Sequence, residues 1–383
     1  MYRLIKRTII FIPFILIYIL FAILSRIKLT YKKIFNIKPS IVWGITPIIN
    51  IISNSKAVKL YGYKSNTVVY NTYYITDEFD YNLEKYFKNK FTRYFVRWVT
   101  FLWVLIKYEI IHFYFDDGFL KDTFISKLEL PLLKFAGKKI IVSAYGSDIR
   151  VESITRKLGK YNCCIDCPIP KRGCICDEKK AEEKIKNVNK WADVVCSLGD
   201  MTEYTPGSNN EIFYTPIDIN EWKYVGVNLN PDKVKIIHAP NHPHYKGTKY
   251  LINVIEELKK EGYKVELILL EKIPNKEAKK YYESADIVAE QFIIGWYGYF
   301  AVECMALGKP VVSYIRKKEY LPKGINCPIV NANPDNLKEV LVNLIKDPFL
   351  RQELGKKGRE YVEKVYSLER VGERWDKLYR KLF

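Results

Sequence analysis

Short apolar runs typical of β-strands alternate with amphipathic runs typical of helices over most of the chain, and this alternation constrains the fold more than any other feature. The strand-like runs are residues 41–43, 67–70, 109–115, 139–143, 193–197 and 211–214, then 234–239, 265–270, 286–289 and 310–315. In the helix-like run 246–261, apolar residues recur at the i, i+3, i+4, i+7 spacing of one helix face. The pattern predicts an α/β protein in which helices cover both faces of parallel sheets.

A segment with little pattern, residues 221–232, divides the strand-like runs into two series. It contains Gly, Asn and Pro and resembles an interdomain linker. We therefore expect one Rossmann-like domain over residues 36–222, a second over 223–366, and a last amphipathic helix over 367–383. Paired domains of this kind bind a ligand in the cleft between them, at the carboxyl ends of the strands.

The composition is that of a globular protein with a strong basic excess. Hydrophobic residues make up 48% and charged residues 27%, which excludes a disordered chain, a collagen and a polytopic membrane protein. Lys and Arg number 62 against 43 Asp and Glu, a net charge of +19 that indicates a polyanionic partner. Outside the N-terminal segment the charge is spread without a dense Arg block, so we expect no nucleic acid among the partners.

The N-terminal residues 1–35 contain seven basic residues and no acidic one. They enclose an uncharged apolar run of 17 residues, Thr8 to Leu24, which is interrupted by Pro13. Seventeen residues is the lower limit for a spanning helix. Three interpretations stay open: a short signal-anchor helix, an interfacial or re-entrant anchor, and a buried core helix. Because the run lacks a polar face, we expect membrane attachment, with the rest of the chain in the cytosol.

A glycine-rich loop leads directly into a helix-like run and then into Gly-x-Pro and a strand, over residues 295–312. Backbone amides at such a helix start attract phosphate or sugar oxygens, so Gly298, Tyr299 and Phe300 are candidate ligand contacts. Glu303 falls on the second turn, where a carboxylate can accept hydrogen bonds from two ribose hydroxyls.

A polar loop follows the strand-like run 234–239 and ends in Lys246-Gly247 at a second helix start. A Lys at this place can neutralise the diphosphate of a departing nucleotide. The loop also contains Asn241, His242 and His244. A metal site at these histidines is the weaker interpretation, because no Cys or carboxylate accompanies them locally.

These residues resemble the group-1 family of retaining glycosyltransferases with the GT-B fold, over about residues 38–383. Lys246-Gly247 match the family's Lys-Gly, and Glu303 matches the second Glu of its Glu-x7-Glu element. In the first half, the segment from Tyr145 to Asp148 (Tyr-Gly-Ser-Asp) is similar to the family's His-Gly-x-Asp loop. The last helix resembles the one that crosses back onto the first domain in that family.

The chain departs from the family pattern at three positions. The first Glu of Glu-x7-Glu falls at Gly295, so its contact to the donor sugar is missing or moved. The basic residue that usually precedes the Lys falls at Asn241, where His242 or His244 would compensate. The family's sugar-contacting His falls at Tyr145. The departures describe a divergent branch of the family.

The resemblance implies transfer of a sugar from a nucleotide-diphosphate sugar to an acceptor hydroxyl, with retention. It implies no cofactor or divalent ion for catalysis, and a glycan or lipid-linked acceptor at the cytoplasmic face of a membrane. The expected catalytic residues are Lys246, Tyr145 and Asp148. The expected donor-binding residues are Asn241, His242, His244, Lys246, Gly247, Gly298, Tyr299, Phe300 and Glu303.

Five of the eight cysteines fall within residues 163–176. Cys164-x2-Cys167 and Cys174-x-Cys176 place four thiolates within 13 residues, so a small structural zinc or iron–sulfur centre is one interpretation. A surface loop of reduced cysteines or local disulfides is the other.

Two other functions compete with sugar transfer. A nucleotide-sugar epimerase of related fold would need paired acid and base carboxylates near the sugar, and the absence of a carboxylate at Gly295 argues against it. A catalytically inactive, membrane-tethered basic scaffold would not need the Lys246 and Glu303 loops.

Overall fold

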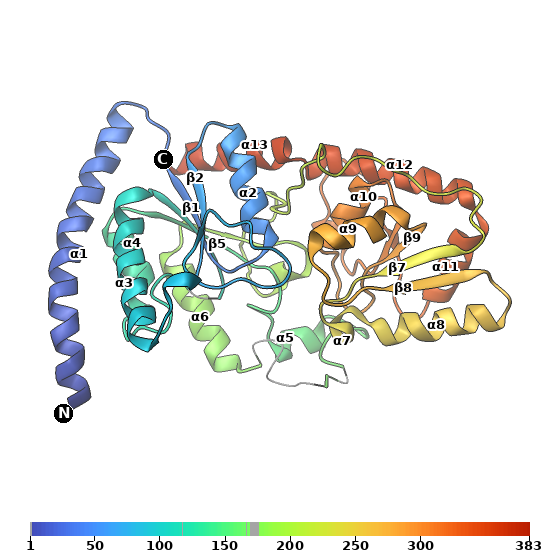
Figure 1. Ribbon diagram of the computed structural model, residues 1–383, viewed down its shortest axis with the longest axis horizontal. Helices are drawn as coiled ribbons and strands as arrows, with labels where there is room; N and C mark the ends of the chain where they lie inside the picture. The colour runs from blue at the N-terminus through green and yellow to red at the C-terminus, as the bar shows by residue number, and fades with distance from the viewer. Residues whose placement is uncertain (1, 117, 166, 169–175) are drawn as a thin grey trace.

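Two parallel sheets, each covered by helices, form the body of the protein (Figure 1). The computed structural model describes residues 2–116, 118–165, 167–168 and 176–383, with the side chains of residues 2–11 and 90 left out. The predicted fold class is confirmed: every strand pair in both sheets is parallel, and helices separate most of the strands along the chain.

The first sheet has six strands in the order β3-β2-β1-β4-β5-β6. The strands are β1 (Ile41–Ile45), β2 (Ser65–Val69), β3 (Tyr81–Asn82), β4 (Ile110–Tyr114), β5 (Lys139–Ser143) and β6 (Val194–Cys196). The helices of this half are α2 (Ile49–Leu60), α3 (Lys90–Lys107), α4 (Glu129–Phe135), α5 (Glu152–Lys157) and α6 (Glu178–Trp191). Strands β1 and β4 are buried along their whole length, which explains why they read as continuous apolar runs.

The second sheet has five strands in the order β11-β10-β9-β7-β8. The strands are β7 (Val234–His238), β8 (Val265–Leu269), β9 (Ile287–Ala289), β10 (Val311–Ser313) and β11 (Val330–Asn331). The helices are α7 (Pro243–Lys246), α8 (Thr248–Lys260), α9 (Asn275–Ser284), α10 (Tyr299–Ala306), α11 (Leu337–Lys346) and α12 (Pro348–Val365).

The last helix, α13 (Leu368–Leu382), packs on α2 of the first half, as Figure 1 shows. Trp375 Nε1 donates a hydrogen bond to Asn54 Oδ1 at 2.7 Å, and Tyr63 donates to Asp376 Oδ1 at 2.8 Å. The chain therefore passes through the second half and ends on the first, which ties the two halves together.

One predicted strand is wrong. Residues 211–214 form no strand, because Phe213 has a φ of 51°, in the left-handed region that an extended strand cannot contain. The apolar character of this segment has another cause, since Ile212, Phe213 and Tyr214 are buried in a core shared by the two halves.

The N-terminal apolar run lies within a 33-residue helix, α1 (Tyr2–Ile34), which lies along the outer side of α3 and α4 (Figure 1). Among the described residues, this is the one helix long and apolar enough to cross a membrane, and 22% of its most apolar window is buried in the protein.

Candidate active site

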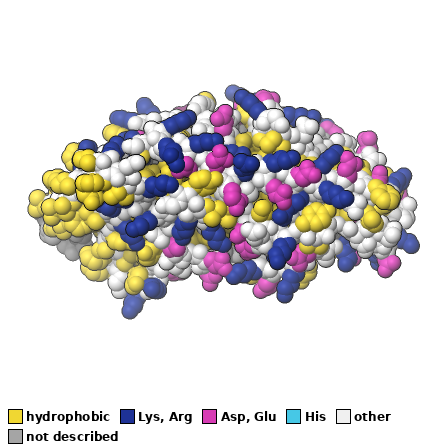
Figure 2. Space-filling model, turned by 90° about the horizontal axis from the view of Figure 1, so that it is seen from above, with side chains coloured by type: hydrophobic (Ala, Val, Ile, Leu, Met, Phe, Trp, Pro, Cys, Tyr) yellow, Lys and Arg dark blue, Asp and Glu magenta, His cyan; other side chains and the backbone are white. Residues whose placement is uncertain are grey.

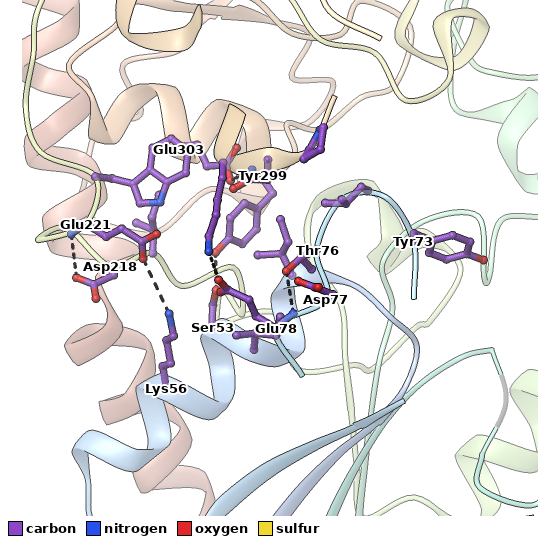
Figure 3. Close-up of a pocket in the computed structure, with 18 of the residues that line it drawn as sticks. Ser53, Lys56, Tyr73, Thr76, Asp77, Glu78, Asp218, Glu221, Tyr299 and Glu303 are labelled. Carbon is purple, nitrogen blue, oxygen red and sulfur yellow. Dashed lines mark hydrogen bonds and ion pairs between the residues drawn. The ribbon is translucent and has the colours of Figure 1, made fainter. Parts of the chain in front are cut away.

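A pocket of about 370 Å³ lies between the two halves (Figure 3). Ser53 and Lys56 of α2 and the loop of residues 73–78 line it from the first half. Asn275, at the start of α9, and Tyr299 and Glu303 of α10 line it from the second half. The pocket therefore has walls from both halves, as expected for a ligand held in an interdomain cleft.

The loop of residues 73–78 connects the first half to the second at this pocket. Tyr74 donates a hydrogen bond to Asn241 Oδ1 at 3.3 Å, and the Asn275 amide donates to the Ile75 carbonyl at 3.3 Å. Glu78 and Lys276 form an ion pair across the same boundary (Figure 3). The loop closes one side of the pocket in this conformation.

Glu303 is buried in the wall of the pocket, with 3% of its surface exposed. Its Oε1 accepts a hydrogen bond from Asn275 Nδ2 at 2.8 Å. Burial raises the pKa of the Glu303 carboxyl to about 8, because the apolar surroundings disfavour its charged form. A ligand that donates hydroxyl hydrogens to this carboxyl would favour the charged form and bind with proton release.

Lys246 and the amide of Gly298, the N-cap residue of α10, converge on one carboxylate. Lys246 Nζ lies 3.1 Å from Glu290 Oε1, and the Gly298 amide donates to the same oxygen at 2.8 Å. Ser313 donates to the other oxygen, Oε2, at 3.1 Å. The Gly298 amide is therefore used within the protein, whereas the partly exposed Lys246 ammonium has further hydrogens that can bind a phosphate oxygen.

Gly247 places Lys246 at this corner. It has a φ of 76°, in the left-handed region, and it ends α7 and caps the start of α8. The Phe292 amide donates to the Lys246 carbonyl at 3.0 Å, which fixes the backbone next to residues 290–298. The Lys-Gly pair of the sequence is thus a tight turn that aims one ammonium at the start of α10.

Glu290 is a site residue that sequence reasoning missed. Its side chain is fully buried behind Lys246, whose own side chain is 20% exposed. Glu290 holds Lys246 and the Gly298 amide in place, and a fully buried side chain can affect a ligand only through such groups. The one indication in the sequence is that Glu290 directly follows the short apolar run of residues 286–289.

Gly295, by contrast, has no room for the side chain that the family pattern expects there. A Cβ atom at Gly295 would lie 2.6 Å from Arg316 Cβ. Arg316 is itself held across the domain boundary by Asp200 at 3.1 Å and by the Tyr161 carbonyl at 3.0 Å. A Glu at position 295 would therefore displace an interdomain ion pair.

We expect Glu290→Gln to keep the hydrogen-bond geometry, because Gln retains one acceptor oxygen, and Glu290→Ala to remove the support of both Lys246 and the Gly298 amide. The Ala variant should lose about 2 kcal/mol of folding stability through the uncompensated ammonium, and donor affinity should fall with it. Thermal unfolding and donor titration of both variants test this. Equal donor affinity in Glu290→Ala and the wild type would show that Glu290 positions nothing.

The loop that contains Asn241, His242 and His244, called the histidine loop from here on, contacts the first half of the chain. His244 Nε2 lies 3.2 Å from the Cys163 carbonyl, and the rings of His242 and His244 pack edge-on against Tyr245. Asn241 accepts the hydrogen bond from Tyr74. These predicted donor-binding residues lie on the second-domain side of the boundary, and two of them already bind first-domain partners.

Two aromatic donor-binding candidates have structural contacts. Tyr299 donates to the Pro216 carbonyl at 2.5 Å and lies 2.8 Å from Ser53 Oγ, so its hydroxyl bridges the two halves. Phe300 packs against Tyr282, with ring centroids 4.9 Å apart. Their backbone amides, at the start of α10, are the groups that can still reach a ligand.

Tyr145 and Asp148 lie in the first half, at the end of β5. Asp148 is buried, and it accepts from the amides of Tyr145 at 3.2 Å and Gly146 at 2.8 Å. Burial, together with nearby Asp116, raises the pKa of the Asp148 carboxyl to about 7. By accepting the two amide hydrogen bonds, the Asp148 side chain fixes the shape of the loop of residues 145–148. The half-exposed Tyr145 donates its hydroxyl to Asp116 Oδ2 at 2.9 Å.

The predicted site residues fall into separate groups. Lys246, Gly247 and Gly298 meet at one corner, Glu303 lies in the pocket, and Tyr145 and Asp148 share one loop. Among the described residues, no hydrogen bond or ion pair joins Tyr145 or Asp148 to Lys246.

The cysteine cluster packs against the histidine loop. Cys163 and Cys164 are buried with Tyr245 and Ile294, and Cys167 packs on them. The described cysteines therefore lie next to the loop that contains His242 and His244. Cys174 lies outside the described residues, and within the described part of the chain no group of three metal-binding side chains comes together.

The metal centre at the cysteine loop stays a prediction. If it exists, elemental analysis of the purified chain should find near-stoichiometric zinc or iron. A Cys167→Ser, Cys174→Ser double variant should lose the metal and some thermal stability, because metal binding and folding of such loops are coupled. Cys327→Ser is the matched control. Metal-free wild-type protein would leave the interpretation of reduced or disulfide-bonded cysteines.

Comparison with known proteins gives structural neighbours only. No family model matches the chain, and no curated protein matches it by sequence. HepE from Anabaena, solved in complex with UDP-glucose, is 12% identical with a TM-score of 0.56, over 90% of this chain and 100% of that one. Sucrose-phosphate synthase from Thermosynechococcus elongatus is 14% identical with a TM-score of 0.53, over 90% and 99%.

The chain has the GT-B fold. A putative UDP-N-acetylglucosamine 2-epimerase from Listeria monocytogenes is similar to the chain to nearly the same degree, at 13% identity and a TM-score of 0.51, over 90% of this chain and 97% of that one. Because the identities are this low, the GT-B fold is what these neighbours establish, and the reaction has to be argued from the site.

Proposed function

We propose that the chain is a glycosyltransferase that moves a sugar from a nucleotide-diphosphate sugar to an acceptor hydroxyl with retention. The observation that carries the proposal is the convergence of Lys246 Nζ and the Gly298 amide on one anionic oxygen, at the start of the helix that carries Glu303. This arrangement suits a diphosphate at the helix start and a ribose one turn further along. HepE, which is solved with UDP-glucose, supports a UDP-sugar as the first donor to test.

In the proposed reaction the leaving diphosphate gains negative charge as the bond to the sugar breaks. The Lys246 ammonium, which Glu290 and Gly247 already hold in place, neutralises that charge together with the amides of Tyr299 and Phe300 at the start of α10. Retention then needs positioning more than a protein nucleophile, with the diphosphate accepting the acceptor proton on the same face. Tyr145 would meet the sugar or acceptor from the first half, held by the loop that Asp148 shapes.

We place the enzyme at the cytoplasmic face of a membrane, where it would act on a glycan or lipid-linked acceptor in cell-surface glycan or glycolipid assembly. The support is the basic, apolar N-terminal segment, together with the cytosolic origin of nucleotide sugars. No divalent ion is expected to be required, so transfer should persist in a chelator.

An epimerase is the second candidate, because one structural neighbour carries that name. It would interconvert the donor sugar without an acceptor. Glu290, the buried carboxylate nearest Lys246, is fully buried and triply hydrogen bonded, which suits a positioning role better than proton transfer to a sugar.

The experiment is a thermal-shift screen of UDP-, GDP- and ADP-sugars against the full chain. A ligand at 100 times its dissociation constant stabilises the folded state by about 2.7 kcal/mol, which is readily measured. Stabilisation by one nucleotide series supports the proposal, and product analysis then separates transfer from epimerisation. The absence of any shift at millimolar ligand would contradict it.

A further inference from the structure

Helix α1 has one face bound to the folded body. Phe14, Tyr18 and Ala22 are buried, and Phe14 meets Trp98 of α3 at a centroid distance of 4.0 Å. Tyr18 donates to the Leu132 carbonyl at 2.8 Å, and Ser25 donates to the Ala136 carbonyl at 2.9 Å. The contacts extend over three turns, so this face is part of the protein core.

The C-terminal part of α1 is bound by charge. Glu109 is buried, with 1% of its side chain exposed, and its two oxygens pair with Lys28 at 2.7 Å and Lys32 at 2.5 Å. Moving α1 away from the body would leave this carboxylate buried without its partners, which is costly. A spanning helix needs about 20 residues surrounded by lipid, and α1 has too few residues outside these contacts.

The opposite face of α1 is apolar and exposed, and α3 continues it. Figure 2 shows hydrophobic side chains gathered at this end of the molecule. On α3, Phe91 is 76% exposed and Phe95 is 59% exposed, with their rings stacked 6.4 Å apart. The other exposed apolar residues here are Ile12, Leu16, Ile17, Ile19, Leu20, Ile23, Leu24, Ile27, Tyr31, Ile34, Val99, Leu128 and Phe135. A patch of this extent on a soluble surface marks an interaction site.

The charge of the N-terminal segment indicates which class of partner binds the patch. Residues 1–35 contain seven basic residues and no acidic one, and five remain when Lys28 and Lys32, the partners of Glu109, are set aside. A second copy packed on the same patch would bring two such segments together and repel. An anionic lipid surface attracts them, by about 1 kcal/mol for each Lys or Arg near the headgroups.

We propose that α1 and the Phe91–Phe95 edge of α3 lie together in the headgroup region of an anionic bilayer, so that the protein rests on one leaflet and α1 does not span it. This specifies the membrane attachment placed in the proposed function. It is independent of the donor site and can be tested without a nucleotide sugar.

The test is co-sedimentation of the full chain with vesicles of phosphatidylcholine alone or mixed with phosphatidylglycerol. The wild type should bind the mixed vesicles more tightly, and binding should weaken with salt. Leu20→Asp with Ile27→Asp should abolish binding. Phe91→Ser with Phe95→Ser should weaken it about tenfold or more, since two aromatic rings no longer enter the interface.

The matched control is Phe349→Ser, on α12 at the far end of the molecule, where the side chain is 71% exposed. It should bind vesicles like the wild type. All variants replace exposed residues, so their thermal unfolding and donor-induced shift should be unchanged. Unaltered vesicle binding by the Phe91, Phe95 variant would overturn the proposal in favour of a spanning α1. A wild type that ignores vesicles and forms a dimer through the patch would overturn it in favour of a second copy.

Discussion

Replacing Lys246 by Ala should lower the turnover number for sugar transfer by about 100-fold or more, with a smaller effect on donor affinity. In the proposed reaction the ammonium faces an oxygen whose negative charge grows as the sugar leaves, so it would stabilise the transition state more than the bound donor. Steady-state kinetics with the donor from the screen measure both parameters. Lys356→Ala, an exposed Lys on α12, is the matched control.

The outcome distinguishes two roles for Lys246. If kcat falls and KM stays close to that of the wild type, the ammonium acts in the transition state. An unchanged kcat with a raised KM would mean that Lys246 only holds the donor. If both kcat and KM are unchanged, Lys246 is not part of the site.

Replacing Glu303 by Ala should raise KM for the donor about 30- to 150-fold, equivalent to about 2–3 kcal/mol of lost charged hydrogen bonds. The ribose does not change during transfer, so kcat should fall much less. Glu303→Gln keeps one acceptor oxygen, so its KM for the donor should lie between the values of the wild type and of Glu303→Ala. Glu369→Ala, which replaces an exposed carboxylate of α13, is the control.

The pH dependence of donor binding gives a second measure of Glu303. Its pKa is raised to about 8 by burial, so in the unliganded protein the carboxyl is mostly protonated at pH 7 and charged above pH 8. The charged form accepts from two hydroxyls, so donor affinity should rise with pH between about 7 and 9. The Gln variant should lose this rise. A flat profile in the wild type would exclude Glu303 from the ribose site.

Most of the fold was predictable because buried parallel strands appear in a sequence as short apolar runs. The predicted runs coincide with β1, β4 and β7 to within a few residues, since these largely buried strands consist mostly of apolar residues. Residues 211–214 show the limit of this reasoning: their apolar side chains fill a shared core, while Phe213 in the left-handed region prevents a strand.

The candidate site was predictable where its groups are close in sequence. Lys246-Gly247 forms a turn, and Gly298 to Glu303 form the start of a helix. Each group is recognisable from the types of its own neighbouring residues. The contacts that complete the site come from distant segments: Glu290 behind Lys246, Asn275 on Glu303, and the loop of residues 73–78. The spacing of residues in one sequence does not reveal such tertiary contacts. The contact by which Arg316 excludes a side chain at Gly295 is another of this kind.

The central claim is best tested by following a radiolabelled sugar. The donor found in the screen is incubated with total glycan and lipid extract from the source cells and either wild-type protein or Lys246→Ala, and the labelled products are separated and identified. The proposed function predicts that the wild type moves label from the nucleotide to an acceptor through a linkage that retains the anomeric configuration of the donor. The variant should do so about 100-fold more slowly. Label that stays on the nucleotide as a different sugar would show an epimerase, and equal transfer by the two proteins would contradict the site.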